Sequence, residues 1–315
     1  MAKPRHRQLD YLVYLAVRLV IALLQVLPLE TAARLARLLA WIVYRVDRRH
    51  RLVADDNLRQ AYGAALTAKQ RDRLIRGVYD HFVRMLIEMV HLPRRMFLGS
   101  WRRHLSLGPR GSEVVAALLV HRPVLIVTGH YGNWELAGYL LAMLGFKSWA
   151  VARPLDNPHL DRLLRMLRQR TGQGLLAKKG ELDRMEEILE GGGIVCTLGD
   201  QDAGQNGLYV DFFGRPASTH KAMAILALRS QALVVVAGAR RLPGILRYEL
   251  VIEDVIDSTM LPDDPAQVRL LTQRLTTALE GMVRGEPSQY LWLHRRWKHQ
   301  PKPRAPRSAS SARAA

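Results

Sequence analysis

A histidine and a glutamate stand between two apolar segments of the chain. His130 and Glu135 belong to the stretch GHYGNWE, which follows the apolar run VLIVT and precedes LAGYLLAMLG. A carboxylate that contacts an imidazole holds it in one tautomer and stabilises its protonated form, so the histidine becomes a better general base. On a continuous helix, residues five apart point about 140° away from each other. A turn between the two residues is therefore needed for contact.

The flanking elements predict such a turn. The β-branched run 124–128 predicts a buried strand, and the segment 134–144 predicts a helix capped by Asn133. We expect His130 at the carboxyl end of the strand and Glu135 in the first turn of the helix. In open α/β sheets, this strand-to-helix crevice is where ligands bind.

Other polar residues are expected at the same edge of the sheet. Arg153 ends one predicted strand, and Asp200 with Gln201 begins a polar, glycine-rich connection after another. The Phe213–Gly214 turn lies in that connection. Taken singly, such residues are usually solvated or cap a helix. Because the carboxyl ends of parallel strands meet at one edge, we expect these segments to converge on the histidine of the motif.

The order of the predicted elements indicates the fold class. The chain has 315 residues, 49% of them hydrophobic, which is enough for one large domain with its own core. Residues 52–98 predict helices, with Thr67 as an N-cap and Pro93 as a stop. From about residue 114, strands alternate with helices, which predicts an α/β fold with a mainly parallel sheet flanked by helices. The single cysteine excludes an internal disulfide framework, and the histidine spacing predicts no metal site.

The N-terminal region predicts a membrane-associating segment. Residues 9–29 form an apolar stretch of about membrane-spanning length, but Arg18 near its middle is costly in a bilayer. A second amphipathic stretch follows. We interpret residues 1–51 as a membrane anchor or a pair of interfacial helices with basic flanks, and a buried helix pair is the alternative. Residues 52–300 are expected to form the α/β domain, and residues 301–315 a disordered basic tail.

The charge balance favours a polyanionic partner. Lys and Arg number 47 against 28 Asp and Glu, which gives a net charge of +19. Nucleic acid, an anionic membrane surface, or a phosphorylated or acidic substrate would suit this excess. The aromatic and basic segment 290–301 could stack on bases, but its place after a helix favours a membrane-interface or packing role. We expect no nucleic-acid partner.

Four motifs together resemble one family of enzymes. HYGNWE resembles the His-x4-Asp/Glu motif of glycerolipid and glycolipid acyltransferases. With ARPLDNPHLDRLLRMLR, GDQDAG…DFFGRPAS and YLWLHRRWK at this spacing, the chain resembles the lipid A biosynthesis (lauroyl/myristoyl) acyltransferase family from Leu9 to Pro301. The resemblance implies that His130 and Glu135 are catalytic. The residues expected on the substrate side are Asn133, Arg153, Asp200, Gln201, Phe213 and Gly214.

The resemblance also implies a reaction. A fatty acyl chain would pass from an acyl-carrier-protein thioester, or from acyl-CoA, to a hydroxyl of an anionic phosphoglycolipid such as a lipid A precursor. This would occur at the cytoplasmic side of the bacterial inner membrane, with no cofactor beyond the thioester co-substrate and no acyl-enzyme. His130 would remove the hydroxyl proton, Glu135 would orient His130, and backbone N–H groups of the GHYGN turn would stabilise the oxyanion.

Two alternatives to this reaction remain at the level of sequence. One keeps the chemistry but has a lysophospholipid or a phosphoinositide mannoside as the acceptor. The other is a non-enzymatic basic protein that binds membranes or nucleic acid, in which His130 and Glu135 are a satisfied core pair.

Overall fold

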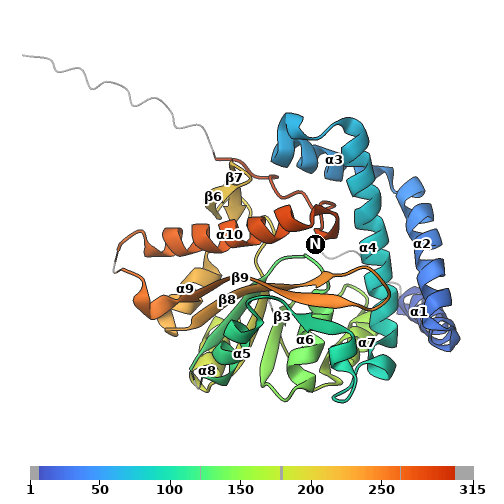
Figure 1. Ribbon diagram of the computed structural model, residues 1–315, viewed down its shortest axis with the longest axis horizontal. Helices are drawn as coiled ribbons and strands as arrows, with labels where there is room; N and C mark the ends of the chain where they lie inside the picture. The colour runs from blue at the N-terminus through green and yellow to red at the C-terminus, as the bar shows by residue number, and fades with distance from the viewer. Residues whose placement is uncertain (1–6, 121, 178–179, 263, 302–315) are drawn as a thin grey trace, which may run out of the picture.

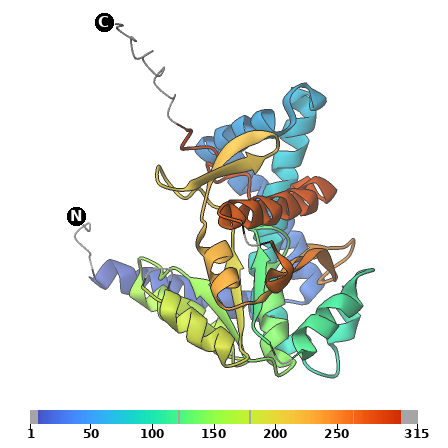
Figure 2. The same ribbon diagram turned by 90° about the vertical axis from the view of Figure 1, so that its left-hand side faces the viewer.

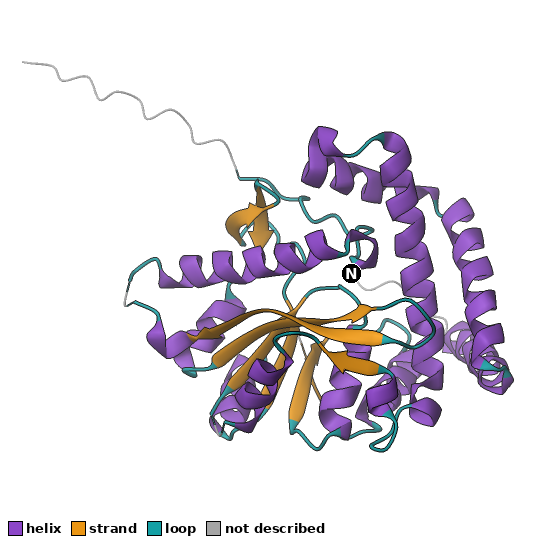
Figure 3. Cartoon of the chain, viewed as in Figure 1, coloured by secondary structure: helices purple, strands orange, loops and turns teal. Residues whose placement is uncertain are grey.

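The computed structural model describes residues 7–120, 122–177, 180–262 and 264–301, and shows a central sheet with helices on both faces (Figure 3). The helices are α1 (Arg7–Val26), α2 (Leu29–Val46), α3 (Arg48–Tyr62), α4 (Ala68–Arg95), α5 (Gly111–Leu119), α6 (Trp134–Met143), α7 (Pro158–Gln169), α8 (Leu182–Glu190), α9 (Ala222–Arg229) and α10 (Gln267–Gly285). The strands are β1 (Leu105–Leu107), β2 (Val124–Thr128), β3 (Ser148–Ala152), β4 (Gly174–Ala177), β5 (Ile194–Leu198), β6 (Leu208–Phe212), β7 (Arg215–Thr219), β8 (Leu233–Arg241) and β9 (Tyr248–Asp257). The predicted tail beyond residue 301 lies outside the described residues.

The main sheet has seven strands in the order β1-β9-β8-β2-β5-β3-β4. Strands β8, β2, β5, β3 and β4 are parallel to one another. β9 runs antiparallel to β8, and β1 is parallel to β9. The predicted α/β class with a mainly parallel sheet is confirmed.

Alternate residues of β2 face opposite layers of helices. Leu125 and Val127 are fully buried in a core that includes residues of α8, α9 and α10. Val124 and Ile126 belong to a separate cluster with residues of α5. Figure 1 shows α10 on one side of the sheet and α5 and α6 on the other. A strand covered on both faces is apolar at nearly every position, as the run VLIVT is.

A second sheet lies where the sequence predicts only a polar connection. β6 and β7 form an antiparallel hairpin that stands beyond α10, away from the main sheet (Figure 2). Its two-residue loop is Phe213–Gly214, and both residues have positive φ, 56° and 70°. Two positive φ values are typical of a type I′ turn, which usually contains Asn-Gly. The predicted turn at these residues is therefore observed, and the strands that it joins were not predicted.

The long helix α4 begins where the sequence predicts and ends later. Thr67 Oγ1 accepts from the N–H of Gln70, and the Gln70 side chain accepts from the N–H of Thr67, which confirms the predicted cap. The predicted stop at Pro93 is wrong, because α4 continues to Arg95. A proline removes only one helical N–H, and this one lies in the last turn, where the buried Met96 holds the helix end in the core.

Helix α1 is bonded to the domain at both ends. Near its start, the Asn157 amide donates to the carbonyl of Asp10 at 2.8 Å. At its end, Arg94 of α4 donates to the carbonyl of Gln25 at 2.7 Å. By length and composition α1 could cross a membrane, and only 6% of its apolar 18-residue stretch is buried inside the protein. A helix of this length spans about 30 Å. Since both ends are held, its axis lies along the domain surface.

Candidate active site

The parallel pairing of β2 with β5 brings His130 and Asp200 together. Thr128 and Leu198, the last residues of the two strands, are register partners. One glycine follows each of them, and the polar residue comes next. Equal offsets from a paired register place the two residues side by side at the carboxyl edge of the sheet. Their predicted convergence is therefore observed.

Two hydrogen bonds fix His130 on the Asp200 carboxylate. The imidazole Nδ1 lies 2.8 Å from Oδ1, and the backbone N–H of His130 donates to Oδ2 at 2.9 Å. An ionised carboxylate only accepts, so Nδ1 carries a proton, and in the neutral form of the ring Nε2 carries the lone pair. The Trp134 indole packs edge-on against the imidazole, with 5.0 Å between ring centroids. This imidazole has the tautomer and the restraint that a general base acting through Nε2 requires.

Asp200 is buried but ionised. Burial acts to raise the pKa of its carboxyl group, but the charge and the hydrogen bonds of His130, together with Arg296, outweigh burial and lower the pKa to about 2. The Tyr290 hydroxyl lies near Asp200, whose charge adds to burial in raising the pKa of that hydroxyl. Arg296 is itself held by the carbonyl of Ser218, to which it donates at 2.7 Å. Asp200 therefore remains negative at every pH near neutrality.

The C-terminal segment YLWLHRRWK packs against the strand-to-helix turn at residues 130–133, called the catalytic turn below. Tyr290 and Trp292 are buried, with exposed fractions of 3% and 1%. The N–H of Leu291 donates to the carbonyl of His130 at 3.0 Å. Of the two roles predicted for this segment, the structure shows packing, and the tyrosine reaches the Asp200 carboxylate from it.

The predicted contact between His130 and Glu135 is corrected by this geometry. The carboxylate on the imidazole Nδ1 is that of Asp200, whereas Glu135 forms a two-point ion pair with Arg168 of α7, with Nε 2.9 Å from Oε2. Glu135 also accepts from the Trp134 indole at 3.1 Å. The reason is directional. Glu135 occupies the second position of α6, from which its side chain reaches toward α7.

An apolar cavity of about 430 Å³ begins beside the Glu135–Arg168 ion pair. Trp134, Glu135 and Thr128 contribute to its wall at the carboxyl edge of the sheet, and Leu144 and Phe146 contribute at the far end of α6. Between these ends the wall is formed by residues of α5, α6 and the sheet, which are almost all apolar. A cavity of this size and lining suits a hydrocarbon chain.

The N–H groups of the catalytic turn are mostly occupied, which corrects the predicted oxyanion donors. The N–H of His130 donates to Asp200, that of Gly132 to the carbonyl of Gln289, and that of Asn133 to the carbonyl of Ala239, at 2.9, 3.0 and 2.8 Å. The next N–H groups along the chain open α6, where a helix offers no internal acceptor.

Asn133 holds the turn and does not face a substrate. Its side chain is fully buried, and its Oδ1 accepts from the N–H of Leu136 at 2.9 Å, which confirms the predicted helix cap. Its Nδ2 donates to the hydroxyl of Tyr248 at 3.1 Å. Both polar atoms are thus engaged, so the predicted substrate contact of Asn133 is replaced by a structural one.

The remaining predicted residues differ in their placement. Arg153 follows β3 at the expected edge, and its side chain is 79% exposed, with Asp156 at 3.7 Å. Gln201 follows Asp200 and is partly exposed. Phe213 is buried in an aromatic cluster with rings of α3 and the C-terminal segment, and Gly214 completes the hairpin turn. Phe213 and Gly214 therefore contribute packing, contrary to the prediction of a substrate contact.

Several residues of the site were not predicted. Arg168 pairs with Glu135, Trp134 packs on the imidazole, Arg296 stabilises the charge of Asp200, and the Tyr290 hydroxyl lies near that carboxylate. Arg168 is the last residue of the motif ARPLDNPHLDRLLRMLR, but the motif does not specify that it pairs with Glu135. For the other three, the motifs HYGNWE and YLWLHRRWK provide the signal, because the first contains His130 and the second packs against it.

Comparison with known proteins identifies the family of this chain. Residues 2–299 match the sequence profile of a family described as bacterial lipid A biosynthesis acyltransferase. A lipid A biosynthesis acyltransferase of Haemophilus influenzae is 23% identical over 254 residues, which cover 80% of this chain and 77% of that protein. A lipid A biosynthesis lauroyltransferase of Escherichia coli is 30% identical over 182 residues, 57% of this chain and 58% of that protein. A phosphatidylinositol mannoside acyltransferase of Mycobacterium tuberculosis is 25% identical over 191 residues, 58% of this chain and 57% of that protein.

Proposed function

Because the chain belongs to the bacterial lipid A biosynthesis acyltransferase family, we propose that it transfers a fatty acyl chain from a thioester to a hydroxyl of a lipid A precursor or a related phosphoglycolipid. The observation that carries this proposal is the His130–Asp200 pair together with an apolar cavity of about 430 Å³, whose wall includes Trp134, the residue that packs on the His130 ring. Acyl transfer to a hydroxyl needs a base for the proton and space for the chain, and this edge of the sheet offers both.

The proposed step uses His130 as the general base. Its Nε2 takes the proton of the acceptor hydroxyl while the hydroxyl oxygen attacks the thioester carbonyl carbon. Asp200 stabilises the imidazolium that forms, as the carboxylate does in a catalytic triad. The tetrahedral intermediate then expels the thiolate, which takes the proton from His130. The acyl chain passes directly from sulfur to oxygen, and no acyl-enzyme forms.

Stabilisation of the oxyanion is assigned to the start of α6. Trp134 and Glu135 are the first two residues of this helix, and their N–H groups have no acceptor within it. The positive end of the helix dipole adds to their effect. In this scheme the Glu135 carboxylate acts indirectly, because it holds the indole that packs on His130.

The charge of the protein supports an acidic carrier protein as the donor. A groove of about 640 Å³ between α3 and the C-terminal segment is lined by Arg48, Arg49, Arg295 and Lys298, among other residues. A surface of this sign attracts an acidic partner and raises its rate of association. Coenzyme A, which carries phosphates, is the alternative donor.

The exposed apolar side chains of α1 support a place at a membrane surface. The most exposed among them include Leu12 and Leu19, each at 61%. We expect the double variant Leu12→Asp, Leu19→Asp to fold and to bind anionic vesicles more weakly in a flotation assay, because it loses apolar area that would enter the interface. Unchanged flotation would contradict a membrane role for α1.

The test of the function is a product assay with competing acceptors. Purified protein is given acyl-carrier-protein thioester or acyl-CoA, together with a lipid A precursor, a lysophospholipid or a phosphatidylinositol mannoside. Mass spectrometry is expected to find the acylated lipid A precursor as the main product, and none with folded His130→Ala. A preference for another acceptor would leave the mechanism unchanged and would identify that acceptor as the substrate. Equal product from His130→Ala would overturn the mechanism.

A further inference from the structure

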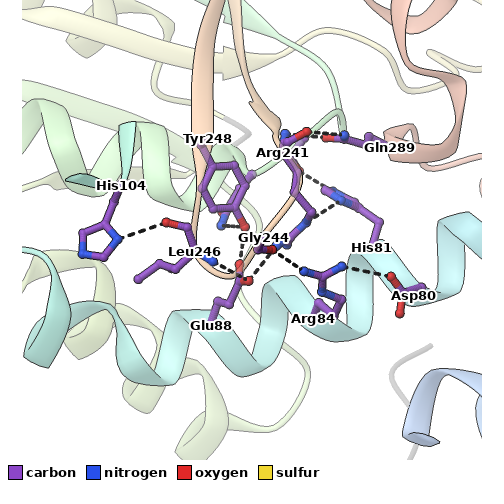
Figure 4. Close-up of polar contacts among 12 residues, drawn as sticks. Asp80, His81, Arg84, Glu88, His104, Arg241, Gly244, Leu246, Tyr248 and Gln289 are labelled. Carbon is purple, nitrogen blue, oxygen red and sulfur yellow. Dashed lines mark hydrogen bonds and ion pairs between the residues drawn. The ribbon is translucent and has the colours of Figure 1, made fainter. Parts of the chain in front are cut away.

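A buried polar cluster joins α4 to the β8–β9 hairpin next to the catalytic turn (Figure 4). His81 and Glu88 come from α4, Arg241 from β8 and Tyr248 from β9. The exposed fractions are 3%, 3% and 1% for His81, Glu88 and Tyr248, and the Arg241 side chain is 7% exposed. We name these four residues the α4 clamp.

The Glu88 carboxylate is the centre of the α4 clamp. Its Oε1 accepts from Arg241 at 2.6 Å and from the N–H of Leu246 at 3.3 Å, and its Oε2 accepts from the Tyr248 hydroxyl. Taking an ion pair out of water costs several kcal/mol per ion, which its attraction offsets only when the remaining hydrogen bonds are made. An apolar cluster of similar volume would avoid that cost, so stability alone does not account for this ion pair.

Tyr248 connects the carboxylate to the catalytic turn. Its hydroxyl donates to Glu88 and accepts from Nδ2 of Asn133 at 3.1 Å. The Oδ1 atom of the same Asn133 side chain accepts from the N–H of Leu136 and so caps α6. One tyrosine hydroxyl thus determines the orientation of the residue that joins the turn to the helix.

His81 holds the same turn from a second point. Its Nε2 donates to the carbonyl of Gly132 at 3.0 Å, while its Nδ1 accepts from Arg241 at 3.2 Å. Burial, followed by the charge of Arg241, lowers the pKa of His81 to about 3. The ring is therefore neutral, and its Nε2–H tautomer is set by the arginine.

The catalytic turn packs closely against β8, which leaves no space for a side chain at Gly132. Gly132 has a φ of 57°, and a Cβ at this position would lie 2.1 Å from the carbonyl oxygen of Ala239. Backbone therefore packs directly on backbone, and the turn can shift only if its polar contacts yield.

We propose that Tyr248 and His81 are positioning residues that hold Asn133 and Gly132, and thereby keep His130 and the start of α6 in reactive geometry. The inference rests on the proposed acyl transfer, because it concerns the rate of that reaction. A merely structural clamp would change stability alone. A positioning clamp also lowers turnover by the folded enzyme, because small displacements of reacting groups cost large factors in rate.

The first test compares two buried tyrosines. Tyr248→Phe removes the hydroxyl between Glu88 and Asn133. Tyr79→Phe is the matched control, because Tyr79 is 3% exposed and its hydroxyl donates to the Asp47 carboxylate at 3.0 Å, away from the turn. We expect both variants to lose thermal stability. Only Tyr248→Phe is expected to lose kcat, by about 10- to 100-fold, with the KM for the thioester little changed. Equal kcat in the two folded variants would overturn the proposal.

The second test uses the other contact and stays informative if Tyr248→Phe does not fold. His81→Gln keeps an N–H donor where Nε2 lies, and His81→Leu does not. We expect kcat to be largely retained in the glutamine variant and to fall in the leucine variant, with both melting temperatures measured. Equal kcat in the two would show that the contact with Gly132 has no role in turnover.

A parallel assay of His130→Ala separates failure of this inference from failure of the proposed function. If His130→Ala turns over normally, the acyltransfer mechanism itself fails. If His130→Ala is inactive while Tyr248→Phe and His81→Leu are as active as the wild type, only the positioning role is wrong.

Discussion

Two carboxylates near His130 lie in contrasting surroundings. Asp200 extends from the end of β5 and is bonded to the imidazole and to the backbone N–H of the histidine itself. Glu135 extends from the start of α6, pairs with Arg168 and forms part of the cavity wall. The first carboxylate is built to stabilise charge on the histidine. The second holds the edge of the space in which an acyl chain would lie.

The difference shows that nearness in sequence is a poor guide to which carboxylate serves a histidine. Glu135 is five positions away, but it lies on a helix whose direction turns the side chain toward α7. Asp200 is 70 positions away, but strand register sets it beside the histidine. Each of the following experiments changes one side of this comparison, beginning with the largest expected effect.

Removal of the Asp200 charge should have the largest effect on turnover. Asp200→Asn and His130→Ala are each expected to lower kcat by about 10²- to 10⁴-fold, because the general base loses its orientation or is absent. The double variant should be little worse than His130→Ala, since effects within a catalytic unit are not additive. If the loss in the double variant equalled the product of the two single losses, the two residues would act independently. Circular dichroism would confirm that each variant is folded.

Asp200 should also leave a signature in acid stability. Its pKa is lowered from 3.8 to about 2, so its ionised form stabilises the fold above pH 4, and this contribution is lost as the pH falls from about 4 to 2. The contribution is about 2 kcal/mol. Urea unfolding of the wild type and Asp200→Asn should therefore show a stability difference that shrinks by this amount from pH 4 to pH 2. A constant difference would contradict the lowered pKa.

The cavity that Glu135 lines predicts an effect on which acyl donor the enzyme prefers. Ala150 lines the cavity between its two ends, and Ala150→Leu adds three carbons there. We expect kcat/KM for a long acyl donor to fall at least about tenfold relative to a short one, since one methylene in a pocket is worth about 1–3 kcal/mol. An unchanged ratio across donors of different length would place the acyl chain elsewhere.

Glu135→Gln should have the smallest effect on rate. The amide oxygen can still accept from the Trp134 indole, although Arg168 loses its charged partner. We expect kcat to fall by no more than about tenfold, the range of one hydrogen bond. A loss as large as that of Asp200→Asn would reverse the comparison and restore the direct role predicted for Glu135.

Much of the fold could be predicted because its signals are local. The apolar run of β2, the Asn133 cap and the Thr67 N-cap each depend on a few adjacent residues, and each is confirmed. The turn at Phe213–Gly214 was predicted, but the strands on either side of it were missed because they lie in a polar, glycine-rich connection. The helix stop at Pro93 was wrong because packing of the helix end offsets the loss of one hydrogen bond.

The candidate site was predicted in outline and not in detail. Alternation of strands and helices places His130, Arg153 and Asp200 at one edge, and this much follows from sequence. Which side chains bond to one another depends on strand register and on the direction of each side chain. The pairing of Arg168 with Glu135 is set by the packing of α7 against α6, and the motif that contains Arg168 does not specify it.

The attachment of α1 at both ends has a consequence for the kinetics expected at a membrane. A helix that lies along the domain surface would enter one face of the bilayer and keep the protein at that face. The enzyme would then meet a lipid acceptor as a mole fraction within a surface and not as a concentration in bulk. Diluting the acceptor with inert lipid, at a constant total amount of acceptor, should therefore slow turnover, whereas diluting the vesicles in buffer should have little effect while the protein remains bound.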